Sequence, residues 1–247
     1  MALPLYLALT SPEMSEKLPE RMAYMACHFS PGGPGLSNLP KVLPPGAMLI
    51  LDDSMPMCDH DPERIAAQLK DLLTRHSCES LLLDFQRPQI PGQQELAEFL
   101  SRDLPCPVAV SALYAEGLPC PVFLPPVPPD KPLAHALSPW QGREIWLEAA
   151  LDGITLTLTR EGCTTSSLLD FPEGGFTDDK LHCHYAVQTN PQGAIFRLWR
   201  TPADLQRLLL DATELGVSRA IGLWQELHNL IPLHHGCEQP QNALPDP

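Results

Sequence analysis

Short apolar runs recur along the 247-residue chain, and several are separated by stretches with the apolar spacing of an amphipathic helix. This alternation is typical of α/β proteins with a parallel sheet. Eight candidate strands predict a closed (β/α)8 barrel of the TIM type, which typically needs roughly 250 residues. The predicted strands are residues 4–9, 22–28, 47–52, 80–85, 107–111, 121–124, 144–150 and 219–224.

Three segments show helical spacing most clearly. Asp61 followed by Pro62 supplies an N-cap and a proline in the first turn, and apolar residues at helical intervals then mark one face. Residues 93–100 form a second predicted helix. Thr201 and Pro202 open a third, which continues to Gly216.

Proline and one polar segment interrupt this alternation. Of the 29 prolines, seven lie in residues 119–132, which therefore must form a strand end and an extended loop. In residues 162–200, the sequence Asn190-Pro191-Gln192-Gly193 separates two strand-like runs and predicts a β-hairpin. We expect one barrel domain over residues 1–237, with a β-hairpin insertion at about 162–200 before the last helix and strand. Residues 238–247 are polar and rich in proline, and we expect them to be disordered.

The composition excludes some partners. The chain carries 30 acidic against 16 basic residues, a formal charge of -14, so a phosphate backbone would repel it. No apolar run approaches the ~18 residues of a membrane span. Residues 1–10 have no preceding basic residues and no small-residue cleavage site after them, so they predict a first strand rather than a signal peptide. We expect a cytoplasmic protein that binds neither nucleic acid nor membrane.

The eight cysteines contain no Cys-x-x-Cys pair, and in a chain without an export signal we expect reduced thiols. Disulfides would require an exported chain.

The most informative segment is residues 79–86, Glu-Ser-Leu-Leu-Leu-Asp-Phe-Gln, at the end of a predicted strand. It resembles strand four of chitinase-type family-18 glycoside hydrolases, Asp-Gly-x-Asp-x-Asp-Phe-Glu. Asp84 matches the aspartate that orients the substrate acetamide in that family. Gln86 replaces the glutamate acid, Leu82 replaces the middle aspartate, and Glu79-Ser80 replaces the leading Asp-Gly.

The C-terminal third resembles the same family, particularly its spore-germination, cortex-acting branch. A hairpin over residues 184–199 is followed by a helix at 202–215 and a final strand ending at Trp224. Residues 143–151 are similar to the family's seventh strand, and residues 61–100 to its third helix, fourth strand and fourth helix. The resemblance covers most of residues 47–227.

In this family the strand-four glutamate protonates the leaving group while the substrate's N-acetyl oxygen attacks. A neutral amide at Gln86 has no proton to give, and general acid catalysis typically contributes about 10²–10⁴-fold. The family's Tyr-Asp pair after strand six is also missing, because residues 124–128 read Leu-Pro-Pro-Val-Pro. The resemblance therefore implies a catalytically degenerate barrel that binds an N-acetylated glycan or peptidoglycan fragment without cleaving it.

The expected binding groove has Asp84 and Gln86 at its centre and Trp224 as a stacking platform. Asp53, Tyr185 and Glu226 are expected on its rim. Two of these residues have a clear structural alternative: Asp53 could cap a loop beside Asp52, and Trp224 could belong to the core. Glu226 is the one carboxylate that could serve as a substitute acid.

No cofactor or metal is expected. Residues 58–61, 182–184 and 234–237 hold histidine, cysteine and aspartate, and His182 and His184 would share a strand face. None of these segments has a recognised ligand spacing. Two functions remain open: an active glycoside hydrolase or a metal-assisted hydrolase using Asp52 and Asp53, and a protein-interaction scaffold. An exposed apolar patch near Trp199 would favour the scaffold. The sequence does not determine the oligomeric state.

Overall fold

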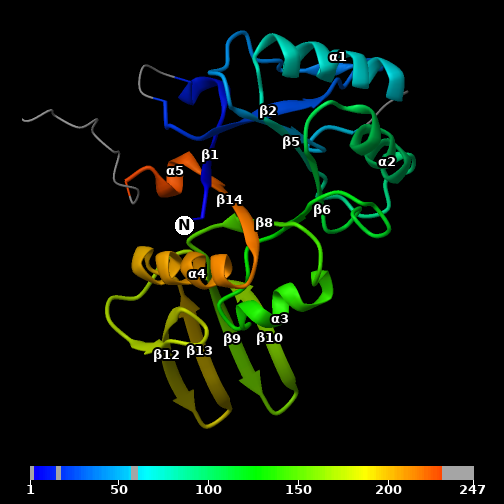
Figure 1. Cartoon of the computed structure of the whole chain (residues 1–247). Coiled ribbons are helices and arrows are strands. Elements are labelled where there is room, and N and C mark those ends of the chain that lie inside the picture. Colours follow the sequence, from blue (N-terminus) through cyan, green and yellow to red (C-terminus); the bar gives the residue numbers. More distant parts are fainter. Residues whose placement is uncertain (1–2, 15–17, 57–60, 230–247) are drawn as a thin grey trace, which may run out of the picture.

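The computed structural model describes residues 3–14, 18–56 and 61–229. Eight parallel strands form a closed barrel in the order β1-β14-β8-β7-β6-β5-β4-β2, and β2 pairs back with β1 (Figure 1). A short strand, β3 (Leu36–Ser37), pairs antiparallel with β2. The barrel strands are β1 (Leu5–Leu9), β2 (Met22–Phe29), β4 (Met48–Asp52), β5 (Ser80–Asp84), β6 (Val108–Ser111), β7 (Val122–Leu124), β8 (Ile145–Ala149) and β14 (Val217–Leu223). The predicted TIM-type barrel is confirmed.

Side chains alternate between the inside of the barrel and its outer surface, because successive strand residues point to opposite faces. Both faces are buried, which explains the nearly continuous apolar runs. The outward residues pack into a large core with the helices. The inward residues fill the barrel; the buried apolar ones are Tyr6, Ala8, Ala23, Met48, Ile50, Leu82, Ala109, Phe123, Trp146 and Ile221.

The three predicted helices are present as α1 (Pro62–Arg75), α2 (Gln93–Asp103) and α4 (Pro202–Glu214). Asp61 caps α1, because its Oδ1 accepts hydrogen bonds from the backbone N–H groups of Glu63 and Arg64. Thr201 opens α4 in a capping box. The structure adds two short helices, α3 (Leu133–Leu137) and α5 (Trp224–Leu227), and the 3-10 turns η1 (Ser11–Glu13) and η2 (Ser138–Trp140).

Three connections of the barrel lack an α-helix in the residues described, and one of them is the loop from β6 to β7. Between β1 and β2 there is only η1, and between β2 and β4 there is β3 followed by a loop. Prolines at 31, 34, 40, 44 and 45 interrupt the second connection, and proline in a helix interior removes a hydrogen bond and clashes with the preceding turn. These neighbouring connections therefore run over the outside of the barrel as loops rather than helices.

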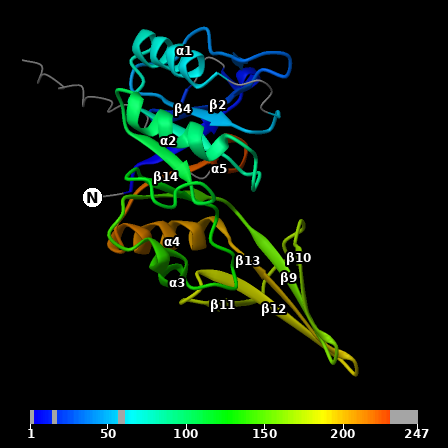
Figure 2. The ribbon, with the colours of Figure 1, turned by 90° about the vertical axis from the view of Figure 1, so that its right-hand side faces the viewer.

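Between β8 and α4 the chain forms a second, antiparallel sheet in the order β10-β9-β13-β12-β11. It projects from the barrel as a long arm (Figures 1 and 2). The predicted hairpin forms its centre and turns between Asn190 and Gly193. The sheet begins at Gly153, ahead of the predicted insertion start, because residues 153–159 alternate apolar side chains with threonine and pair as a strand. The strands are β9 (Gly153–Thr159), β10 (Gly162–Ser167), β11 (Phe176–Asp178), β12 (Cys183–Asn190) and β13 (Gly193–Trp199).

Candidate functional site

A small cavity opens where the carboxyl ends of the barrel strands meet, the face on which barrel enzymes carry their active sites. We call it the mouth cavity; its volume is about 100 Å³. Three carboxylates from three strands reach it: Asp52 from β4, Asp84 from β5 and Glu148 from β8. The rest of its lining is Ala8, Met25, Ile50, Leu82, Phe123, Ile221, Gly222 and Leu223.

Burial and mutual repulsion raise the pKa of two of these carboxyls. Burial, followed by the charges of Asp52 and Asp53, raises the pKa of Asp84 to about 6, although a hydrogen bond from Gln86 opposes the change. Burial also raises the pKa of Glu148 to about 7, with Asp84, Glu226 and Asp152 adding to the effect. Near neutral pH, the mouth cavity therefore contains a carboxyl group that can exchange a proton.

Gln86 lies at the rim of the mouth cavity and is exposed. Its side-chain Nε2 donates a hydrogen bond to Asp84 Oδ1, and its backbone N–H donates to Asp53 Oδ1 at 3.0 Å. The amide is therefore oriented by Asp84. An amide in this position can donate a hydrogen bond but cannot act as a general acid.

Asp53 is buried and lies outside the cavity lining. Its carboxylate accepts hydrogen bonds from the backbone N–H groups of Gln86 and Arg87, at 3.0 and 2.9 Å, and from Gln93 Nε2 at 3.0 Å. It therefore fixes the loop that follows β5. The neighbouring Asp52 accepts a bond from the Ser54 N–H at 2.8 Å, yet its side chain faces the mouth cavity.

The other expected site residues are divided between the mouth and more distant positions. Glu226 Oε2 accepts a hydrogen bond from the Leu151 N–H at 3.3 Å, and its charge acts on Glu148, so it lies near the rim. Trp224 is not in the cavity lining: it packs on the outer core, and its ring lies 5.1 Å from that of His228. Leu223 occupies the inward position instead.

Tyr185 lies in the second sheet, outside the cavity lining, with its ring 5.5 Å from the Phe176 ring. Strand pairing puts Phe176, Tyr185 and Leu198 on one face and Trp199 on the other. Trp199 is only 2% exposed, whereas Phe176 is 65% exposed. A scaffold function would therefore use the Tyr185 face rather than the surroundings of Trp199.

Glu148 was not among the residues predicted from the sequence. The signal was its position in Ile145-Trp-Leu-Glu-Ala149, because period-two alternation puts Trp146 and Glu148 on the same, inward face. A charged residue in an apolar barrel strand marks a candidate for function.

The two histidines of the hypothetical metal site join the second sheet to α4. His182 Nε2 lies 2.8 Å from Asp211 Oδ2, and His184 Nδ1 lies 2.7 Å from Asp204 Oδ2. Across residues 3–14, 18–56 and 61–229, no group of three or more histidine, cysteine or acidic residues could hold a metal ion. The other two segments with candidate ligands, at 58–60 and 234–237, lie outside the described residues.

Two further expectations from the sequence concern the redox state of the cysteines and the absence of a membrane-spanning segment. The cysteines at 27, 78, 106, 120, 163 and 183 are free thiols. None of the helices described has the length and apolar character needed to span a bilayer.

No protein-family model and no curated protein matches this chain. Several solved structures do. The spore cortex-lytic enzyme of Bacillus cereus has a TM-score of 0.51 and 10% identity, over 89% of this chain and 70% of that one. A chitinase from Chromobacterium violaceum has a TM-score of 0.52 and 9% identity, over 90% and 93%. A family-18 N-acetylglucosaminidase from Paenibacillus barengoltzii has a TM-score of 0.54 and 8% identity, over 89% and 94%. These similarities show that the chain has the fold of family-18 barrels.

Proposed function

We propose that this protein is a family-18-like barrel that binds an N-acetylated glycan, such as a chitin or peptidoglycan fragment, and does not hydrolyse it. The observation that carries the proposal is Gln86, a neutral amide held by Asp84 at the position where the strand-four resemblance expects the acid. The named activities of the similar structures, a chitinase, an N-acetylglucosaminidase and a cortex-lytic enzyme, support the ligand class.

The size of the mouth cavity restricts how such a ligand would bind. Its volume of about 100 Å³ is well below the ≈ 300–1,000 Å³ of pockets that enclose a whole ligand. Only a substituent such as an acetamido group would enter, with the sugar ring lying across the mouth. Its N–H would donate to Asp84, and its methyl group would meet Leu82 and Phe123.

Calorimetric titration with N-acetylglucosamine oligomers tests binding. We expect saturable binding by the wild-type protein and at least tenfold weaker binding by Asp84→Asn, which keeps the shape but loses the charged acceptor. Ser166→Ala, on the exposed strand β10, is the control and should bind as the wild type does. Absence of binding at millimolar oligomer would overturn the proposal.

Measuring product release from chitin oligomers tests the proposed absence of hydrolysis. The wild-type protein should release no product from chitin oligomers, whereas Gln86→Glu restores a carboxyl group beside Asp84 and should raise the rate about 10²-fold or more above background. Hydrolysis by the wild-type protein would contradict the proposal.

A second candidate function is hydrolysis with Glu148 as the acid. The observation that favours it is the pKa of about 7 at a carboxyl that lines the mouth cavity together with Asp84. Turnover by the wild-type protein near pH 6–7 that is lost in Glu148→Gln and kept in Glu226→Gln would establish this function and exclude the first.

A further inference from the structure

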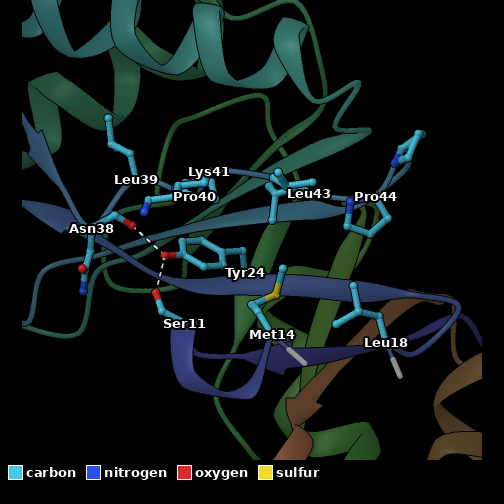
Figure 3. Close-up of a pocket in the computed structure, with 12 residues that line it drawn as sticks. Ser11, Met14, Leu18, Tyr24, Asn38, Leu39, Pro40, Lys41, Leu43 and Pro44 are labelled. Carbon is cyan, nitrogen blue, oxygen red and sulfur yellow. Dashed lines mark hydrogen bonds between the residues drawn. The ribbon is translucent and has the colours of Figure 1, made fainter. Parts of the chain in front are cut away.

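A second and larger cavity lies on the outside of the barrel, away from the mouth. We call it the outer groove; its volume is about 730 Å³. Figure 3 shows Tyr24 at its centre, between the segment that carries Ser11, Met14 and Leu18 and the loop from Asn38 to Pro44. The groove lies along the β1–β2 and β2–β4 connections, where the described residues form no α-helix. It is therefore the part of the barrel surface that a helix would ordinarily cover.

The lining of the outer groove is apolar, and its central polar atom is already hydrogen-bonded. The Tyr24 hydroxyl lies 2.7 Å from Ser11 Oγ and donates to the Asn38 carbonyl at 2.7 Å (Figure 3). Leu39 and Val42 are exposed on the loop side, Val42 at 74%. An occupant therefore gains mainly by burying apolar side chains.

The end of the described chain lies beside this groove. Helix α5 packs against β1. Although burial raises the pKa of Glu13, hydrogen bonds from Thr10 and Gln225 and the charge of His228 bring it below its ordinary value. Glu13 belongs to η1 and lies between Ser11 and Met14, which line the groove, so α5 lies beside the segment that forms one wall of the outer groove.

The sequence that follows α5 matches the apolar lining. Residues 230–233 read Leu-Ile-Pro-Leu, and the remainder of the chain to residue 247 contains no other apolar run of that length. Each extended residue spans about 3.3–3.6 Å, so this run begins within a few residues of the groove wall. Proline at 232 disfavours helix at Ile231 and favours an extended segment.

We propose that residues 230–233 bind in the outer groove of their own chain and cover β2 at Tyr24 in place of a helix. The proposal is independent of the glycan-binding function, because the outer groove and the mouth cavity share no lining residue.

The test uses the full chain with the double substitution Ile231→Asp and Leu233→Asp, together with a fluorescein-labelled peptide of residues 228–236. In the variant the groove is vacated, so the peptide should bind with micromolar affinity in an anisotropy titration. Binding to the wild-type chain should be at least tenfold weaker, because its own segment competes. A chain with Ala243→Asp and Leu244→Asp is the matched control and should behave as the wild type does.

The groove side is tested in the same variant background. Adding Val42→Asp should weaken peptide binding at least tenfold, whereas Leu210→Asp, at an exposed position of α4, should leave it unchanged. Hydrogen exchange of residues 38–45 should be faster in the Ile231→Asp, Leu233→Asp chain than in the wild type.

Three results would overturn the proposal. The peptide binds neither chain, or it binds the wild type and the variant equally. Alternatively, the wild-type chain associates with increasing concentration in sedimentation, and the double substitution abolishes this association, which would assign the groove to a second copy of the chain.

Discussion

The mouth cavity and the outer groove differ in size and in composition. The mouth cavity, about 100 Å³, has three carboxylates from three separate strands; the outer groove, about 730 Å³, is walled by leucine, valine, methionine and proline. The mouth arises because a closed barrel brings all strand ends to one rim. The groove arises where the neighbouring β1–β2 and β2–β4 connections form no α-helix in the described residues. The mouth cavity is therefore the better candidate for a reactive site, because carboxylates from separate strands meet there, although the outer groove is larger.

Each cavity has an energetic cost to the fold. In the mouth, desolvation and repulsion make two carboxyls hold their protons more tightly. In the groove, apolar side chains such as Val42 are left uncovered by the residues that the structure describes. Local departures from optimal folding of this kind are commonly found at functional positions.

The barrel interior beneath the mouth cavity should be tightly packed, unlike the outer groove. Loose packing there would contradict the comparison between the two regions. Trp146 is fully buried there, and the Arg219 guanidinium lies 4.7 Å from its ring. We expect Trp146→Ala to lower the free energy of unfolding by about 3–5 kcal/mol, measured by urea denaturation. Trp140→Ala, at a half-buried position outside the barrel, should cost clearly less; equal effects would contradict the difference in packing.

Asp53 tests whether the rim of the mouth depends on a buried acceptor. Asp53→Ala leaves two backbone N–H groups and the Gln93 amide without their partner, and should cost about 3 kcal/mol. Asp52→Ala removes a single hydrogen bond at the edge of the mouth and should cost about 1 kcal/mol. Chemical denaturation of both variants distinguishes the two roles, and a larger effect at Asp52 would reverse our assignment.

Glu148 makes the mouth sensitive to pH. Its pKa in the folded state is about 7, above its ordinary value of 4.5, so the folded state holds the proton more tightly. Stability should therefore fall as pH rises from about 4.5 to 7 and remain lower above that range. Glu148→Gln should remove the Glu148 part of this dependence, leave the fall between about pH 4 and 6 that Asp84 causes, and stabilise the protein by about 1–3 kcal/mol above pH 7. Thermal unfolding from pH 4 to 9 measures it. An unchanged pH profile in Glu148→Gln would show that Glu148 is not the group responsible.

The smallest effect is expected in the outer groove. If residues 230–233 cover Val42, then Val42→Ala and the Ile231→Asp, Leu233→Asp pair should be coupled by about 0.5–1 kcal/mol in a double-mutant cycle. Additive effects would show that Val42 and this segment do not meet.

The barrel could be predicted from local signals in the sequence. Its period-two strands, the Asp61-Pro62 and Thr201-Pro202 helix starts and the turn at Asn190–Gly193 are such signals, and the structure agrees with each of them. The end of β5 could also be located, because strand four of family-18 barrels provided a frame for Asp84 and Gln86. These features depend on residues a few positions apart.

The composition of the mouth could not be predicted in this way. Glu148 meets Asp84 because barrel closure brings the ends of β8 and β5 to one rim, although the two residues lie far apart in sequence. Asp53 points away from the mouth because three donors hold it, and Trp224 faces the outer core because Leu223 takes the inward position. Spacing along the chain predicts on which face of a strand a side chain lies, whereas the distances and charges among residues from separate strands are fixed only when the sheet closes.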